Sequence, residues 1–178
     1  VIFHARHMQA QEIFTEAYDK HADAIFRHCY LRVYDRELAR DLTQETFMKA
    51  WNHYGETEEK IENLKSLLYK IATNLIIDYS RRPGSKKMNS LEDMVEAGTE
   101  PGEDHSNKLK DALDAKDALK VLEHIKEEYR EVVMLRYFSD LSLKQTSEAL
   151  GINENLVSVR LNRAMQDLRK HLRTYERA

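Results

Sequence analysis

The residues whose types and spacing best suit a chemical task lie near the C-terminus, on both sides of Gly151. Ser142 followed three residues later by Gln145 is a capping box, which starts a helix. Gly151 lets the backbone reverse at little cost, and Asn153 can cap a second helix. That second helix carries hydrogen-bonding side chains away from its apolar positions: Ser158, Arg160, Asn162, Arg163 and Gln166. Such side chains bind base edges and phosphates, so the pattern predicts a helix-turn-helix that places its second helix in a DNA major groove.

A second polar set lies between residues 36 and 54, where helical periodicity is clear and Asp35 is expected to cap the start of the helix. The side chains follow the spacing i, i+3, i+4 and i+8 and so share one helix face: Asp41, Gln44, Glu45 and Lys49. Leu38, Leu42 and Phe47 lie on the other side of this helix. Periodicity alone favours a solvated surface for the polar stripe, and a docking face is the alternative.

The elements that must position these residues are helices. The chain is rich in charged residues and poor in proline and glycine, which favours an all-α fold. We expect two small helical domains, 11–82 and 108–173, joined by a flexible acidic linker, 83–107. His7-Met8 resembles a cloning junction, so the native chain is expected to start at Met8 and residues 1–7 are expected to lie outside the fold.

Composition excludes several classes of protein. The one cysteine, Cys29, allows neither an internal disulfide nor a cysteine-based zinc site. No apolar run approaches the roughly 18 residues that span a bilayer, and no signal peptide is visible, so a cytoplasmic location without membrane insertion is expected. The sequence has no glycine-rich phosphate loop, clustered metal ligands or nucleophile motif. We therefore expect no enzyme, no cofactor, no metal and no small-molecule substrate.

The charge distribution limits how tightly the chain can bind DNA alone. The formal net charge is −3. Residues 160–178 hold six basic and two acidic side chains, whereas residues 89–117 hold nine acidic side chains against three lysines. Because affinity for DNA comes mostly from phosphate neutralisation, we expect weak binding by the isolated chain and dependence on a larger partner.

Three segments in order resemble one family. Residues 41–51 (DLTQETFMKAW) look like the segment of bacterial sigma factors that docks on RNA polymerase. Residues 68–82 (LYKIATNLIIDYSRR) resemble their promoter-melting helix, and residues 129–133 (YREVV) with the helix-turn-helix resemble their fourth domain. With only these two domains, the chain is similar to the extracytoplasmic-function group of the sigma-70 family.

This resemblance implies a role for each set of residues. The stripe of Asp41, Gln44, Glu45 and Lys49 would bind core RNA polymerase. The promoter's minus-ten element would be captured as unstacked bases, which needs stacking surfaces and amide hydrogen bonds. The candidates for that task are Tyr54, Asn63, Lys65, Lys70, Asn74, Ile77, Asp78 and Arg81. The minus-thirty-five element would be bound by Lys144, Ser158, Val159, Arg160, Asn162 and Arg163.

Two positions of the second helix depart from the family pattern. Leu156 stands where threonine is usual, which removes a phosphate contact. Val159 stands where serine is common, which replaces a polar base contact by an apolar one, as to a thymine methyl.

The implied function is that of an alternative sigma factor, with core RNA polymerase, promoter DNA and an anti-sigma factor as partners. A stand-alone helix-turn-helix regulator, which would bind duplex DNA as a dimer, remains the alternative. Such a regulator has no use for a docking stripe at residues 41–49.

Overall fold

The computed structural model describes residues 2–56, 63–82 and 119–175. Its elements are α1 (Ile2–Val33), α2 (Arg36–Glu56), α3 (Leu64–Ser80), α6 (Glu127–Val133), the π-helix η1 (Met134–Phe138), α7 (Leu143–Leu150) and α8 (Glu154–Tyr175). The all-α prediction is confirmed, because every element in these residues is a helix. The predicted linker, 83–107, lies outside the described residues. In the part of the chain that the structure covers, no helix has the length and apolar character needed to cross a membrane.

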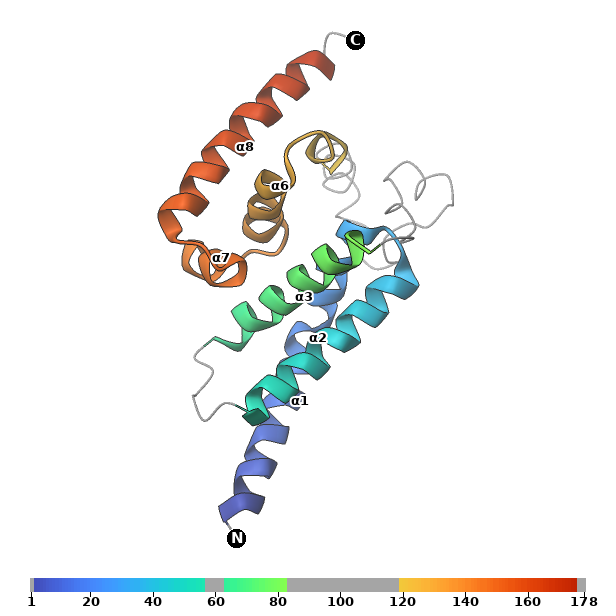
Figure 1. The fold of residues 1–178 in the computed structure, drawn as a ribbon, viewed down its shortest axis with the longest axis vertical. Coiled ribbons are helices and arrows are strands. Elements are labelled where there is room, and N and C mark those ends of the chain that lie inside the picture. Colours follow the sequence, from blue (N-terminus) through green and yellow to red (C-terminus); the bar gives the residue numbers. More distant parts are fainter. Residues whose placement is uncertain (1, 57–62, 83–118, 176–178) are drawn as a thin grey trace, which may run out of the picture. The chain divides into compact units, whose positions relative to one another are not determined.

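The chain divides into two compact units, one built on α1, α2 and α3 and the other on α6, η1 and α8. In the first unit each of the three helices packs against the other two (Figure 1). Its core is formed by fully or nearly fully buried side chains from all three helices: Ile25, Cys29, Val33, Ala39, Leu42, Ala50, Leu68, Ala72 and Ile76. This bundle fixes the directions in which the outer faces of α2 and α3 point.

The boundaries of the first three helices follow from local chemistry. Asp35 was expected to cap α2, and its Oδ1 accepts a hydrogen bond of 3.0 Å from the Leu38 amide. Asn63 caps α3 in the same way, accepting from the Ser66 amide at 3.1 Å. α1 begins at Ile2, within the residues that were expected to lie outside the fold, and no proline or glycine interrupts the helix there.

One arginine organises the start of the second unit. The Arg130 guanidinium donates to the carbonyls of Leu122 at 2.9 Å, Glu123 at 3.0 Å and Ile125 at 3.4 Å. These carbonyls belong to the end of a helical turn, where few backbone acceptors have an intrahelical donor, although the Leu122 carbonyl also accepts from the Ile125 amide at 3.4 Å. Arg130 therefore fixes the chain before α6 to α6 itself.

The π-helix η1 prepares the entry into the helix-turn-helix. After it, Asp140 adopts a left-handed backbone with φ 51°, and Arg136 donates to the Leu141 carbonyl. Leu141 also donates its amide to the Leu135 carbonyl at 3.0 Å, and its side chain is fully buried. Leu141 thus anchors the segment that leads into α7.

The helix-turn-helix has the local structure that the sequence predicts. The Ser142 amide donates to Gln145 Oε1 at 2.9 Å, and the Gln145 amide donates to Ser142 Oγ at 3.1 Å. Gly151 has φ +65°, and Asn153 Oδ1 accepts from the Leu156 amide at 2.8 Å. The capping box, the glycine turn and the second cap are therefore confirmed.

Candidate polymerase- and DNA-binding surfaces

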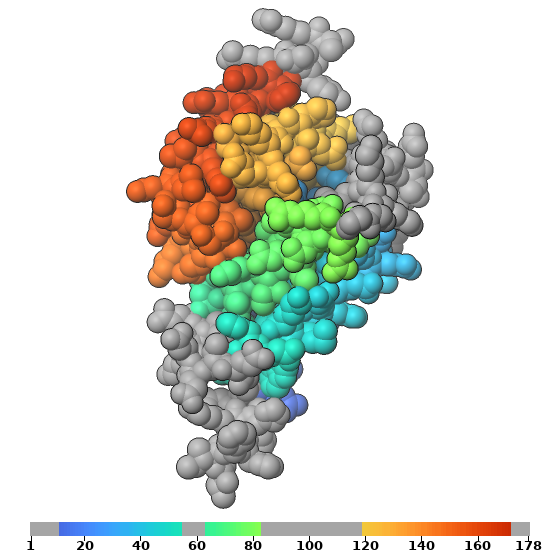
Figure 2. Space-filling model, viewed as in Figure 1, coloured from blue at the N-terminus to red at the C-terminus, as the bar shows by residue number. Residues whose placement is uncertain are grey.

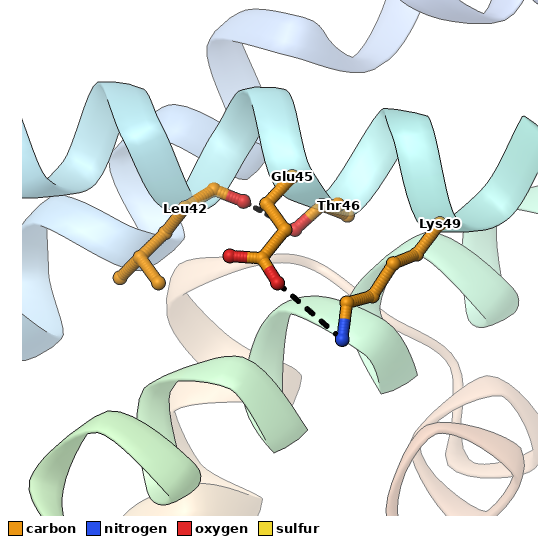
Figure 3. A network of polar contacts seen from close by, with 4 residues as sticks. All are labelled: Leu42, Glu45, Thr46 and Lys49. Carbon is orange, nitrogen blue, oxygen red and sulfur yellow. Dashed lines mark hydrogen bonds and ion pairs between the residues drawn. The ribbon is translucent and has the colours of Figure 1, made fainter. Parts of the chain in front are cut away.

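The predicted docking stripe lies on the outer face of α2. Asp41, Gln44 and Lys49 are exposed, and Glu45 is half-buried. Glu45 Oε1 and Lys49 Nζ are 3.4 Å apart, one helical turn from each other (Figure 3). An exposed pair of this kind contributes at most about 1 kcal/mol, so a partner can separate it at little cost.

The opposite side of α2 explains why the stripe faces outward. Thr46 is fully buried, and its hydroxyl donates to the Leu42 carbonyl at 2.7 Å (Figure 3). Phe47 is also buried. Because Thr46 and Phe47 are buried on the inner side of α2, the stripe on the other side of the helix points away from the bundle.

Met48 is a residue of this surface that sequence reasoning missed. Its side chain is 60% exposed and lies one turn from Gln44 and three residues after Glu45. An exposed apolar side chain amid polar ones is a typical anchor in a protein interface. Its spacing from Gln44 and Glu45 places it on the same helix face, but an apolar residue does not belong to a polar pattern.

A groove between α2 and α3 brings together residues from two predicted sets. Its volume is about 390 Å³, and it is lined by Lys49, Asn52, His53, Leu67, Lys70, Ile71 and Asn74. α2 and α3 lie side by side on the face drawn in Figure 2. Lys70 and Asn74, predicted to bind the minus-ten element, therefore lie together with Lys49, whereas Asn52 and His53 were not predicted. The groove combines two ammonium groups with two amides, which are donors for phosphates and bases.

The other minus-ten candidates divide between surface and structure. Asp78 and Arg81 are exposed on or just after α3, and Ile77 and Lys65 are half-buried. Tyr54 packs edge-on against Phe14, with ring centroids 5.3 Å apart. Asn63 is the cap of α3. Tyr54 and Asn63 thus have structural roles, and their contact with DNA stays a prediction.

The minus-thirty-five candidates also divide. Lys144 on α7 is exposed, and so are Val159, Asn162 and Arg163 on α8. Ser158 is half-buried, and its hydroxyl donates to the Glu154 carbonyl at 3.1 Å. Gln166, which the sequence places among the hydrogen-bonding side chains of this helix, is also exposed, and so are Asn155 and Leu156, which were not predicted to contact DNA.

Arg160 differs from its neighbours because it already has an anionic partner. Its Nη2 lies 3.1 Å from Glu128 Oε2 on α6, and its side chain is 23% exposed. A DNA phosphate would have to compete with Glu128 for this guanidinium. A contact between Arg160 and a DNA phosphate therefore stays a prediction.

Comparison with known proteins identifies the family. Residues 17–85 match the family described as Sigma-70 region 2, and residues 116–168 match Sigma-70, region 4. The ECF RNA polymerase sigma factor SigW of Bacillus subtilis is 32% identical over 173 residues, which cover 92% of this chain and 90% of SigW. The RNA polymerase sigma factor SigV of the same organism is 32% identical over 153 residues, 85% of this chain and 86% of SigV.

The fold is also shared with a solved structure. The sigma factor RpoE of Bartonella quintana, crystallised with the anti-sigma factor NepR, matches with a TM-score of 0.67 at 23% identity, over 91% of this chain and 98% of that chain. The chain therefore belongs to the sigma-70 family, in its extracytoplasmic-function (ECF) group. The comparisons give no support to a stand-alone helix-turn-helix regulator.

Proposed function

We propose that this chain is an alternative sigma factor, which binds core RNA polymerase and directs it to promoters that carry two recognised elements. The observation that carries this proposal is the match to region 2 and region 4 in one chain, in that order. The first match contains the α2 stripe and the α2–α3 groove, and the second contains the helix-turn-helix. The proposed domains are 11–82 and 108–173.

Each surface receives one task. Asp41, Gln44, Glu45 and Lys49 would bind the polymerase, with Met48 as an apolar contact within the stripe. The α2–α3 groove would hold part of the separated minus-ten strand. The exposed face of α8 would bind the minus-thirty-five element as duplex DNA. The chain would act by binding, with no catalytic reaction of its own.

Partners and location complete the proposal. We place the protein in the cytoplasm, where RNA polymerase acts, and we assign it an anti-sigma factor as a regulatory partner. Support for that partner comes from the family and from the fold match to a sigma factor solved with its anti-sigma factor.

The first test is assembly with the polymerase. Purified full-length chain is mixed with bacterial core RNA polymerase and separated by size-exclusion chromatography at moderate salt. We expect co-elution, and loss of co-elution for the double variant Asp41→Ala, Glu45→Ala. The matched control is Asp19→Ala, Asp23→Ala, which removes two exposed acids with the same spacing from α1.

Thermal melting of both variants separates docking from folding. We expect both to melt close to the wild type, because all four side chains lie at the surface or half-buried. If the α2 variant lost polymerase binding together with a marked drop in melting temperature, the loss of binding would be explained by unfolding and would contradict the docking assignment. A chain that ran alone as a dimer and bound duplex DNA unaided would contradict the proposed function itself.

A further inference from the structure

Two large apolar side chains stand exposed on the outer face of α8. Leu156 is 37% exposed and Val159 is 43% exposed. They are three residues apart, so they lie next to each other on one helix face. Val157 and Ala164 are fully buried and supply the packing of α8. Leu156 and Val159 therefore do not belong to the core, and we call these two residues the apolar pair.

The surroundings of the apolar pair are those of a nucleic-acid surface. The exposed side chains on the same face are Asn155, Asn162, Arg163 and Gln166. This face carries no acidic side chain between residues 155 and 166. Amides and a guanidinium around an apolar centre suit a partner that offers both hydrogen-bonding edges and a small apolar group.

The polar side chains adjacent to the pair are turned to other partners. Ser158 donates its hydroxyl to the Glu154 carbonyl, and Arg160 is held by Glu128. The Ser158 hydroxyl hydrogen is therefore engaged within the helix and not directed at a base edge. What α8 offers at positions 156 and 159 is apolar surface.

Only one apolar group is displayed on base edges in the major groove, the C5-methyl group of thymine. The family resemblance implies a phosphate contact at position 156, which the apolar side chain of Leu156 cannot make. We propose that Leu156 and Val159 instead contact the methyl groups of neighbouring thymines and so make α8 select thymine at adjacent positions of its DNA element. This inference rests on the proposed function, because it needs α8 to lie in the major groove of the minus-thirty-five element.

The size of the effect follows from the burial of methyl groups. Removing one methyl or methylene group from water favours binding by about fourfold in affinity at 25 °C. We expect each contacted thymine to contribute about that factor. The contact releases no counterions, so it should leave the salt dependence of binding unchanged.

The test replaces thymine by uracil, which removes only the methyl group. The holoenzyme of this full-length chain with core polymerase first selects its upstream element from a random duplex library. Each thymine of the selected element is then replaced by deoxyuridine, and binding of the holoenzyme to each duplex is measured. The variants Leu156→Ala and Val159→Ala are compared with wild type, and the matched control is Tyr137→Ala, which removes another exposed apolar side chain from the same unit.

The expected result is a loss of about fourfold at one or two adjacent positions with wild type. In Leu156→Ala and in Val159→Ala, the difference in affinity between thymine and deoxyuridine duplexes should become smaller at one of these positions. In the control Tyr137→Ala, this difference should equal that of wild type. Equal binding of thymine and uracil duplexes by wild type would overturn the inference and leave the proposed function intact. The inference would also be overturned if Leu156→Ala and Val159→Ala kept the preference for thymine over uracil but lost binding to a protein partner. Failure of the holoenzyme to select any upstream element would instead overturn the proposed function.

Discussion

Acidification should destabilise the first unit through one buried histidine. The His28 side chain on α1 is fully enclosed by the bundle, with its Nε2 3.3 Å from Thr73 Oγ1 on α3. Its ring also meets the Tyr69 ring edge-on, with centroids 5.2 Å apart. Burial, and then the positive charge of Arg32, lower the pKa of His28 from 6.5 to about 3. The imidazole is therefore neutral in the folded protein at neutral pH.

The sign of the effect follows from this lowered pKa. The unfolded chain binds a proton at His28 near pH 6.5, whereas the folded chain does not until about pH 3. The contribution of neutral His28 to the free energy of unfolding is present above pH 6.5. It is lost as the pH falls from 6.5 toward 3, by about 1.4 kcal/mol for each pH unit. Between pH 7.5 and 5, His28 should lower the free energy of unfolding by about 2 kcal/mol.

The assay can follow this unit alone, because the chain has a single tryptophan, Trp51, on α2. Its ring packs edge-on against Phe14, with centroids 5.1 Å apart, so its fluorescence reports on the α1–α2 packing. Urea unfolding followed by this signal at pH 7.5, 6.5, 5.8 and 5 gives the free energy at each pH. His28→Gln removes the titrating group and keeps a polar side chain at the site.

Comparison with a second variant separates pH dependence from general stability. Thr73→Val removes the hydrogen-bond partner and should lower stability at every pH by about 1 kcal/mol, while it keeps most of the slope. His28→Gln should lose most of the 2 kcal/mol difference, whatever its absolute stability. A residual slope of the same sign is expected from His21, whose pKa is lowered by partial burial and by Lys20 and Lys65. The same slope in wild type and His28→Gln would refute the reasoning.

Further variants address the other parts of the molecule. Gly151→Ala should destabilise the chain by about 1 kcal/mol in urea unfolding, because φ is +65° there although a Cβ would have open space. Arg130→Met should cost about 2 kcal/mol in the same assay, because three backbone carbonyls lose their hydrogen bond to the guanidinium. Cys29 should react with a thiol reagent only on unfolding, because burial keeps its side chain inaccessible and raises the pKa of its thiol to about 12. Lys70→Gln in the α2–α3 groove should flatten the slope of log affinity against log salt by about 0.7 on single-stranded minus-ten DNA, and an unchanged slope would exclude a phosphate contact.

The parts of the fold that sequence predicted well are those decided within a few residues. The caps at Asp35 and Asn153, the Ser142–Gln145 box and the turn at Gly151 all depend on local hydrogen bonds. A side chain that accepts from an amide three residues away does so with little help from the rest of the chain. These local signals were enough to predict the helix-turn-helix and the start of α2.

The parts that sequence did not reveal depend on residues that are distant in the chain. Tyr18 belongs to the apolar periodicity of α1, yet it is 48% exposed, because its ring packs at the edge of the bundle against Phe47. The role of Arg130 depends on carbonyl groups, which no pattern of side chains displays. The π-helix η1 also lies inside a segment whose apolar spacing predicts only a continuous helix.

The pair between Arg160 and Glu128 links the charge of this chain to its proposed way of acting. In the sequence, Arg160 is one of the basic residues near the C-terminus of a chain whose net charge is −3. In the structure, the Glu128 carboxylate of α6 lies 3.1 Å from its guanidinium. Each phosphate contact that is forgone lowers the affinity for DNA and its salt dependence. We therefore expect α8, with Arg160 paired to Glu128, to bind DNA weakly when the chain is alone, and to gain promoter affinity chiefly when a larger partner holds it near the duplex. With such a low intrinsic affinity, the proposed contacts of Leu156 and Val159 with thymine methyl groups would make up a larger share of the discrimination between sites.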